Sequence, residues 1–289
     1  MQFTKMHGLG NDYVYLDGFN HPLPSTDDEL AHLARTLADR HTGIGGDGLI
    51  LALPPTPNEA DNQLPGAHAR MRMFNADGSE AEMCGNGIRC VAKLIHDHQL
   101  VPTPIPNPLL IQTGNGTLSL AYTTDPDNKI DQVTVDMGAP ILDLPDIPVD
   151  ETKLDTDLDG AAYVSMGNPH VMIYIDDDEP LEQPQRGRAL EVHPAFPNRI
   201  NVHFVRVHSP DEVSVYHWER GSGATLACGT GACAVAVAGV LTNRTNRQIT
   251  AHLPGGDLIL EYREADNHVY MTGPAVEVFT GTLTPPTAV

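Results

Sequence analysis

Residues 75–92 read NADGSEAEMCGNGIRCVA, and Cys84 lies in the middle of this stretch. A second copy, ERGSGATLACGTGACAVA, occupies residues 219–236 and has Cys228 at the same position. In each copy a strand-like run ends at a polar residue, and nine positions later a cysteine precedes Gly-x-Gly and an apolar, helix-like segment. The chain therefore presents two matched thiols.

The similarity between the two halves extends beyond the cysteine motifs, because apolar alternation and helical spacing predict the same order of elements in both. In the first half we expect strands at 3–6, 13–16, 49–53 and 67–73, helices at 27–39 and 87–98, and a hairpin over 109–122. In the second half we expect strands at 130–137, 163–165, 171–175, 202–207 and 213–218, helices at 181–190 and 232–241, and a hairpin over 248–262. The turn-rich segment TDPDN, residues 124–128, is the expected junction, so the repeated unit is about half of the chain.

Two local signals complete the outline of the first half. TDDE at residues 26–29 is a capping box, which starts the helix at 27–39. Residues 54–66 contain several prolines and are expected to form a surface loop.

The composition indicates a globular protein with many turns. Of the 289 residues, 40% are hydrophobic, only 5% are aromatic and 24 are prolines. A formal charge of −21 and a pI near 4.8 argue against nucleic acid and against an anionic membrane surface as partners, because both would repel the chain. No apolar run is long enough to span a bilayer, and the first residues lack the pattern of a signal peptide, so the cytoplasm is the expected location.

Four cysteines are too few for a disulfide framework in a chain of this length. Their spacing does not match zinc ligands either, because Cys84/Cys90 and Cys228/Cys233 are neither C-x2-C pairs nor followed by histidine pairs. Free thiols remain. For Cys90 and Cys233, which fall inside apolar helices, we expect a role as core filler.

A cysteine directly before a helix lies among unpaired backbone N–H groups at the positive end of the helix dipole. This setting lowers the pKa of the thiol and creates an anion site, because Gly85-Asn86-Gly87 and Gly229-Thr230-Gly231 present amides without side-chain obstruction. If the two units meet face to face, both helix starts can hold one carboxylate, with a sulfur on each side of the attached carbon. Such a site would racemise an amino acid, with one thiolate removing the Cα proton and the opposite thiol supplying another.

No cofactor and no metal are expected at such a site. No lysine lies in a pattern that suggests a pyridoxal Schiff base, and no cluster of metal ligands is visible. The site itself must then stabilise a carbanionic transition state with backbone amides and by excluding water. A dinucleotide fingerprint starting at Gly229 is a competing interpretation, but residues 221–227 before it are not the buried strand that this fingerprint needs.

At these motifs the sequence closely resembles the diaminopimelate epimerases, which interconvert LL- and meso-diaminopimelate without a cofactor on the route to lysine and peptidoglycan. The likeness covers essentially the whole chain. Its most specific parts are HGLGND at residues 7–12, residues 74–89 around Cys84, GNPH at residues 167–170, Asn201-Val202, and residues 219–231 around Cys228.

By that resemblance Cys84 and Cys228 are the two acid/base residues, each serving one stereochemical direction. The carboxylate at the reacting carbon would be held by Gly85, Asn86, Gly229 and Thr230, and its surroundings by Asn11 and Asn168. The distant amino acid head would be bound by Asn75, Asn201, Glu219 and Arg220. A bidentate arginine for its carboxylate and a glutamate for its ammonium are a suitable pair for a zwitterion. His170 and Glu219 would also tune the pKa of the thiols.

Simpler interpretations of these residues stay open. Asparagine is common in turns for backbone reasons alone, which would account for Asn11 and Asn168. Glu219 and Arg220 could form an ordinary surface ion pair, and His170, one of 14 histidines, could be a structural residue.

Two other functions also stay open. A proline or hydroxyproline racemase shares the logic of paired cysteines, although a single ring needs no second site for a zwitterion such as Glu219 and Arg220 would form. A non-catalytic protein that binds an amino acid or a nucleotide would explain the glycines but not the matched cysteines.

The resemblance also implies the fold, which belongs to the α+β class. Two pseudo-symmetric domains would each consist of a curved, mostly antiparallel sheet wrapped around a central helix, with the site in the cleft between them. The last strand, near 275–281, would cross back to the first domain. The expected domains are therefore 1–126 with 275–289, carrying Cys84, and 127–274, carrying Cys228.

Two further features follow from the same resemblance. A homodimer is implied, with an aromatic residue near the end of the chain in the contact, and Phe279 fits that place. At Gly48 some relatives carry glutamine, so a side-chain contact to the substrate there would be lost or replaced by backbone or water.

Overall fold

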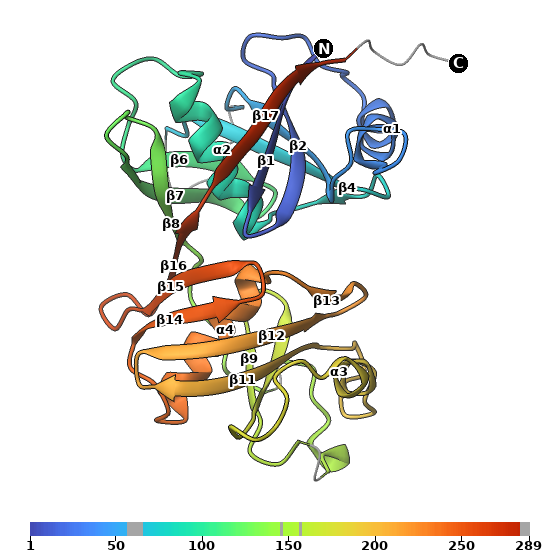
Figure 1. The fold of residues 1–289 in the computed structure, drawn as a ribbon, viewed down its shortest axis with the longest axis vertical. Helices are drawn as coiled ribbons and strands as arrows, with labels where there is room; N and C mark the ends of the chain where they lie inside the picture. Colours follow the sequence, from blue (N-terminus) through green and yellow to red (C-terminus); the bar gives the residue numbers. More distant parts are fainter. Residues whose placement is uncertain (57–65, 145–146, 156–157, 284–289) are drawn as a thin grey trace. The chain divides into compact units, whose positions relative to one another are not determined.

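The computed structural model describes residues 1–56, 66–144, 147–155 and 158–283 (Figure 1). Contacts divide the chain into two compact units, of which unit 1 comprises Met1–Val135 and Gly273–Val289, and unit 2 comprises Asp136–Thr272. The bounds expected from the sequence, 1–126 with 275–289 and 127–274, stay a prediction about where separate domains begin and end. In the described part of the chain no helix is both long and apolar enough to cross a membrane.

Unit 1 alternates strands with two longer helices. Its elements are β1 (Gln2–Gly8), β2 (Asn11–Asp17), α1 (Asp27–Ala38), β3 (Gly48–Leu53), β4 (Ala69–Asn75), β5 (Glu80–Ala81), α2 (Gly85–Asp97), β6 (Leu109–Thr113), β7 (Gly116–Thr124), β8 (Ile130–Asp136), which ends at the border with unit 2, and β17 (Val276–Thr282).

Unit 2 repeats this plan with small additions. Its elements are the 3-10 turn η1 (Glu151–Lys153), β9 (Ala162–Ser165), β10 (Pro169–Tyr174), α3 (Pro184–Glu191), β11 (Asn201–Ser209), β12 (Glu212–Glu219), β13 (Gly223–Thr225), α4 (Gly229–Leu241), β14 (Gln248–Leu253), β15 (Gly256–Tyr262) and β16 (Val269–Pro274), which reaches into unit 1.

The pairing of the strands repeats as well. Most neighbouring strands are antiparallel, and each unit contains two parallel pairs at equivalent places. These pairs are β2–β3 and β4–β6 in unit 1, and β10–β11 and β12–β14 in unit 2. Because hydrogen-bond register and direction recur together, the internal repeat expected from the cysteine motifs is a repeat of topology.

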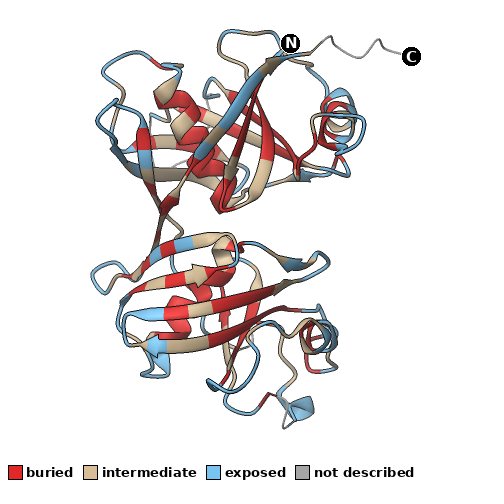
Figure 2. Cartoon of the chain, in the orientation of Figure 1, coloured by how far each residue is buried: buried red, intermediate tan, exposed pale blue. Residues whose placement is uncertain are grey.

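Each unit is built around one helix. In unit 1, α2 packs against β1, β2, β3 and β17, and in unit 2, α4 packs against β9, β10, β11, β14 and β15. Nearly all side chains of α2 and the residues from Gly231 to Gly239 of α4 are buried, which is typical of a helix that a sheet surrounds (Figure 2). The expected α+β fold with two sheets and two central helices is confirmed.

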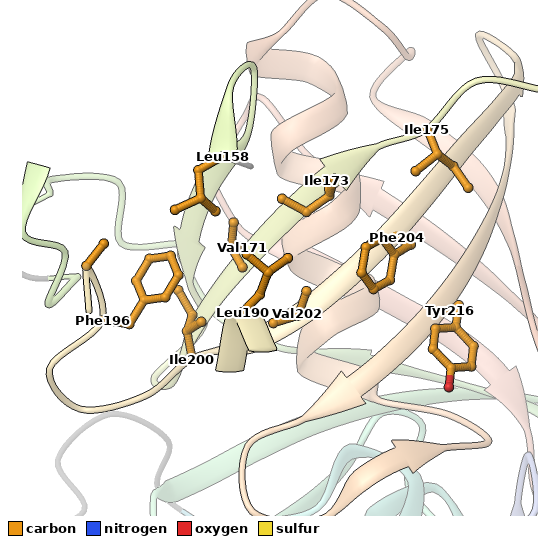
Figure 3. Packing of buried hydrophobic residues seen from close by; sticks show 11 residues of the cluster. Leu158, Val171, Ile173, Ile175, Leu190, Phe196, Ile200, Val202, Phe204 and Tyr216 are labelled. Atoms are coloured by element: carbon orange, nitrogen blue, oxygen red, sulfur yellow. The ribbon is translucent and has the colours of Figure 1, made fainter. Parts of the chain in front are cut away.

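A second apolar layer lies between the outer helix α3 and the strands of unit 2. Val171 and Ile173 of β10 and Val202 and Phe204 of β11 pack with Leu190 of α3 (Figure 3). The alternation of these residues along both strands places them on one face, since successive side chains of a strand point to opposite sides. The equivalent layer in unit 1 joins α1 to β2, β3 and β4.

Helix α1 shows how the local signals operate. Thr26 is its N-cap and accepts a hydrogen bond from the backbone of Glu29 at 3.3 Å, and the Glu29 carboxylate accepts one from the backbone of Thr26 at 3.2 Å. The helix buries Leu30, Leu33 and Leu37. The predicted capping box and the predicted helix at 27–39 are both confirmed, with Asp39 as C-cap.

The last strand returns to unit 1, as expected for 275–281. β17 pairs antiparallel with β1 along its whole length, and the ring of Phe279 meets the ring of Phe3 edge-on with centroids 5.8 Å apart (Figure 1). The first and the last strands of the chain are therefore neighbours in one sheet.

Some elements differ from the sequence-based expectations. The helices expected at 87–98 and 232–241 begin two and three residues earlier, at Gly85 and Gly229, and the helix expected at 181–190 begins only at Pro184. A proline fits the first turn of a helix because its missing N–H has no partner there. The short strands β5 and β13, and also β16, were not expected. Of the proline-rich loop at 54–66, residues 57–65 lie outside the described residues.

Arg89 of α2 is fully buried in the middle of unit 1. Its guanidinium donates to the carbonyl of Pro274 at 3.3 Å, to the carbonyl of Gly85 at 3.2 Å and to Oδ1 of Asn86 at 3.0 Å. One cation therefore joins the start of α2 to the chain segment that leads into β17.

We expect Arg89→Met to destabilise the protein by about 3 kcal/mol, because it leaves several buried acceptors without a donor. The measurement is the midpoint of urea unfolding followed by far-ultraviolet circular dichroism. Arg188→Met is the matched control, since Arg188 lies exposed on α3, and it should change stability by less than about 0.5 kcal/mol. Equal midpoints for the two variants would contradict a structural role of Arg89.

Candidate active site

Cys84 is the N-cap of α2, as its position before Gly-x-Gly indicates. Its backbone is extended, with φ −138° and ψ 118°, and its sulfur accepts a hydrogen bond from the N–H of Gly87 at 3.4 Å. The thiol in turn donates to Oδ1 of Asn11 at 3.3 Å. Cys84 is half-buried, so the sulfur lies within the first turn of a buried helix without being sealed in the core.

An acidic residue determines which way the Asn11 amide points. Asp47 accepts from Nδ2 of Asn11 at 2.7 Å and from the backbone N–H of Asp12 at 3.1 Å, and Arg40 donates to the same carboxylate at 2.9 Å. With Nδ2 held by Asp47, Oδ1 of Asn11 is directed toward Cys84. Asp47 was not selected from the sequence, although an acid inside the glycine-rich GIGGDG is a signal that could have found it.

The two cysteines of unit 1, Cys84 and Cys90, differ in how deeply they are buried. Cys90 is fully buried inside α2, and burial raises the pKa of its thiol to about 11, which suits the expected core filler. Tyr13 lies beside Cys84, and burial first, then the nearby Cys84 sulfur, raise the pKa of its hydroxyl. Tyr13 therefore stays a neutral hydroxyl next to Cys84.

Gly48 is a glycine for a steric reason. A Cβ at this position would lie 2.0 Å from the carbonyl oxygen of Phe74, because β3 pairs closely with β4 here. Gly48 is paired with Tyr13 on one side and with Asn75 on the other. Any side chain at position 48 would push β4 away, so only backbone is presented at this point.

Asn75 ends β4, and Asn86 lies in the first turn of α2. Nδ2 of Asn75 donates to the Ser79 hydroxyl at 3.0 Å. Asn86 is only 3% exposed, and its Oδ1 is held by Arg89. Arg89 is thus a residue next to the site that sequence reasoning missed, and the signal was a charged side chain one helical turn after Gly85 in an otherwise apolar helix.

In unit 2, Cys228 is the N-cap of α4, with φ −116° and ψ 106°. Its sulfur lies 3.7 Å from the hydroxyl of Thr230. Cys228 is buried, and burial first, then the negative charge of Glu219, raise the pKa of its thiol well above the usual range. The sequence predicts a lowered pKa from the helix start, and this is wrong for Cys228, because burial of the thiol and the charge of Glu219 outweigh the backbone hydrogen bond from Gly231.

Asn201 connects the polar residues at the end of β12 to β10. Its Nδ2 donates to the carbonyl of Pro169 at 2.9 Å, and its Oδ1 accepts from the backbone N–H of Arg220 at 2.9 Å. The side chain of Arg220 is exposed and donates to the carbonyl of Asn198 at 3.2 Å. Asn201 thereby positions the backbone next to Glu219.

His170 lies in β10 opposite Asn201 and is fully buried. Its Nε2 is 2.9 Å from Oδ1 of Asn168, and its Nδ1 is 2.8 Å from Nε2 of His203. Burial first, then the charges of His217 and Arg220, lower the pKa of His170 to about 3, so the ring is neutral. His203 and His217 were not selected from the sequence, although His203 lies between the buried Val202 and Phe204, and His217 follows the buried Tyr216.

The predicted site residues divide between the two units, and only some of them contact a cysteine directly. Unit 1 holds Cys84 with Asn11, Gly48, Asn75, Gly85 and Asn86, and unit 2 holds Cys228 with Asn168, His170, Asn201, Glu219, Arg220, Gly229 and Thr230. Asn11 contacts the Cys84 sulfur, and Glu219 and Thr230 lie next to Cys228. Within the described ranges no three His, Cys, Asp or Glu side chains are arranged to hold a metal ion. None of the four cysteines, all of which the structure describes, forms a disulfide bond.

The fold is shared with a class of proteins that includes racemases and epimerases. A phenazine biosynthesis protein of the PhzF family from Bacillus anthracis aligns with a TM-score of 0.68 at 16% identity, covering 98% of this chain and 99% of that one. A probable proline racemase from Agrobacterium radiobacter aligns with a TM-score of 0.66 at 15% identity, covering 98% and 93%. At this level of identity the two structures show the fold alone.

Sequence similarity is more specific. The model of the diaminopimelate epimerase family matches residues 3–142 and 162–278. A diaminopimelate epimerase from Desulfitobacterium hafniense is 48% identical over 292 residues, with 98% of each chain covered. This chain belongs to the diaminopimelate epimerase family.

We expect Glu219→Gln to lower the pKa of the Cys228 thiol, because it removes a negative charge next to a group that becomes an anion. The thiol pKa should stay above that of a free cysteine, since burial makes the larger contribution. The measurement is the rate of alkylation of Cys228 against pH, followed by peptide mass spectrometry. Glu212→Gln, at the opposite end of β12, is the matched control and should leave the profile unchanged. An unchanged profile in Glu219→Gln would refute the assigned contact.

Proposed function

We propose that this chain is an isomerase that interconverts LL- and meso-diaminopimelate by proton transfer at Cα, with Cys84 and Cys228 as the acid/base pair. The observation that carries the proposal is the repeat of one device, a cysteine as N-cap of the central helix in each unit of a member of this family. Two such groups are what a reaction needs that removes a proton from one face of a carbon and returns one to the other face.

In the proposed reaction one thiolate takes the Cα proton, so that the C–H bond breaks and an S–H bond forms. The electron pair stays on the carbon and is delocalised into the attached carboxylate. The second thiol then gives its proton to the opposite face and becomes the thiolate, which leaves the enzyme ready for the reverse direction. No redox step and no further reactant are required.

Negative charge on the carboxylate increases as the carbanion forms. The backbone N–H groups at the N-termini of α2 and α4 would stabilise this added charge. Gly85 and Asn86 in unit 1, and Gly229 and Thr230 in unit 2, lie in first turns whose backbone N–H groups have no partner within their helix. Donors aimed at developing charge stabilise a transition state more than the ground state. We assign the reacting carboxylate to these amides.

Glu219 and Arg220 are assigned to the amino acid head that does not react. The Arg220 guanidinium is exposed, while its backbone is anchored by Asn201. Asn75 would take part from unit 1. A proline or hydroxyproline substrate has no second ammonium and carboxylate for these groups, which favours diaminopimelate over the rival substrates.

The proposed cycle needs one cysteine as the thiolate and the other as the thiol. The raised pKa of Cys228 keeps it a thiol at neutral pH, ready to donate a proton. Cys84 accepts from the Gly87 N–H, a contact that stabilises a thiolate as well. A substrate ammonium next to Glu219 would offset the negative charge that disfavours the Cys228 thiolate.

We expect Cys84→Ala and Cys228→Ala each to lower epimerisation of diaminopimelate by more than about 100-fold, because each removes one of two acid/base groups. Cys90→Ala and Cys233→Ala are the matched controls, since they delete the same group from the buried faces of the same helices. In heavy water the wild type should place solvent deuterium at Cα of the product. A Cys84→Ala enzyme that epimerises at the wild-type rate would eliminate the two-thiol mechanism.

The same assay tests the alternative of a non-catalytic binding protein, against which membership of the diaminopimelate epimerase family argues. Such a protein would bind diaminopimelate without any incorporation of deuterium. The expected cytoplasmic location stays a prediction.

We also propose that the chain forms a homodimer through β17. Three apolar side chains of this strand are exposed, namely Val276 by 40%, Val278 by 54% and Phe279 by 47%. Exposed apolar side chains that lie together on one strand are typical of a surface that another chain covers.

We expect Phe279→Lys to convert the dimer into a monomer, because it places a charge in an apolar contact. Sedimentation velocity measures the state, and far-ultraviolet circular dichroism verifies that the variant is folded. Leu241→Lys, at the end of α4 and 51% exposed, is the matched control and should remain a dimer. A folded Phe279→Lys dimer would exclude this surface.

A further inference from the structure

Three histidines lie in a row across neighbouring strands of unit 2, and each of them is fully buried. Nδ1 of His170 in β10 lies 2.8 Å from Nε2 of His203 in β11, and Nδ1 of His203 lies 2.7 Å from Nδ1 of His217 in β12. At the other end Nε2 of His170 lies 2.9 Å from Oδ1 of Asn168. Four side chains therefore form one continuous line of hydrogen bonds.

A line of neutral imidazoles has a direction, because each ring has one N–H donor and one acceptor nitrogen. Oδ1 of Asn168 can only accept, so the proton of His170 is on Nε2 and its Nδ1 accepts from Nε2–H of His203. Nδ1 of His203 then accepts from Nδ1–H of His217. Burial keeps the rings neutral, since it lowers the pKa of His170 and of His217 to about 3.

The surroundings of His217, at the end of the line opposite Asn168, favour this hydrogen-bond direction over the reverse one. Nε2 of His217 is buried and has no hydrogen-bond partner among the described residues. In the direction given above this atom is a bare acceptor, whereas in the reverse direction it carries an N–H. A buried N–H without a partner is the rarer and costlier case. The lack of a hydrogen-bond partner for Nε2 of His217 among the described residues thus disfavours the reverse arrangement.

His170, at the other end of the line, determines which atom of the Asn168 amide points away from the line. Asn168 is half-buried and follows Gly167, whose φ of +90° forms the turn between β9 and β10. With Oδ1 held by His170, the NH₂ group is the part of the amide that remains for a ligand. Asn11 in unit 1 is held the opposite way, by its NH₂ group on Asp47, so the two asparagines present opposite atoms.

The same line lies directly below the start of α4. A Cβ added to Gly231 would lie 2.4 Å from Cε1 of His203 and 3.1 Å from the sulfur of Cys228. The ring of His203 therefore packs against the turn that carries Cys228, and only a glycine at position 231 leaves room for it.

We propose that His203 and His217 are positioning residues, which act through His170 to fix the Asn168 amide with its NH₂ group toward an anionic group of the substrate. This rests on the proposed function, in that Asn168 is taken to contact the substrate. Neither histidine touches the substrate itself. The line is the counterpart in unit 2 of the Asp47 contact that orients Asn11 in unit 1.

The first test is the tautomeric state of the rings, which long-range ¹H–¹⁵N correlation spectra of the protein labelled at histidine report directly. We expect Nε2–H for His170 and His203 and Nδ1–H for His217 at neutral pH, with signals assigned from the single variants. The reverse set of tautomers, or a charged imidazolium at any of the three, would overturn the proposal. This spectrum requires no activity, so it stands apart from the proposed function.

The second test is a double-mutant cycle on kcat/KM for diaminopimelate. We expect His217→Leu to lower it about tenfold, because the reverse arrangement becomes accessible and the Asn168 amide can turn. His217→Asn should stay near the wild type, since its NH₂ group can donate to Nδ1 of His203. His208→Asn, an exposed histidine of β11 bonded to Ser214, is the control without effect.

The second arm of the cycle measures the effect of His217→Leu in a protein that also carries Asn168→Ala. There His217→Leu should cause no further loss, since the amide that it orients is gone. An equal loss in both backgrounds would mean that His217 only supports the packing under α4, which contradicts the proposal. A wild-type protein without epimerase activity would refute the proposed function, while the tautomer spectrum would still decide the direction of the line.

Discussion

The first turn of a buried helix leaves backbone N–H groups without partners inside the helix, and this constraint organises both units. Water cannot reach these groups freely where a sheet surrounds the helix, so a side chain or a ligand must satisfy them. Cys84 does so through its sulfur, which accepts from the N–H of Gly87. The same backbone requirement that stabilises the fold thereby places a reactive atom beside a set of donors suited to an anion.

In both units a cysteine is the N-cap of the central helix, but the side chains around the cysteine differ between the units. Around Cys84 the partners are charged and partly open to solvent, with Arg40 and Asp47 behind Asn11. In unit 2 a buried line of neutral side chains from His217 to Asn168 lies behind the helix start, and the charge of Glu219 lies next to Cys228. The two units therefore share a topology, while the side chains around the two cysteines differ.

Much of the local structure could be predicted from single stretches of sequence. The capping box at Thr26 and the two hairpins depend on residues that are close along the chain, so short sequence signals predict them. Gly48 shows what a single stretch of sequence cannot predict. The carbonyl group that leaves no room for a side chain at position 48 belongs to Phe74 in another strand. Arg89 is a similar case, since the acceptor at Pro274 is far away in sequence.

The sequence by itself determined the repeat, the family resemblance and the identity of Cys84 and Cys228, because all three reside in the order and spacing of residues. Only the tertiary structure decided how acidic the Cys228 thiol is and which way the side-chain amides of Asn11 and Asn168 face. Burial and the charge of Glu219 raise the pKa of Cys228 against the effect of the backbone hydrogen bond from Gly231. The direction of the histidine line follows from contacts between three strands. Desolvation and hydrogen-bond direction depend on atoms brought together by folding, and no spacing along the chain encodes them.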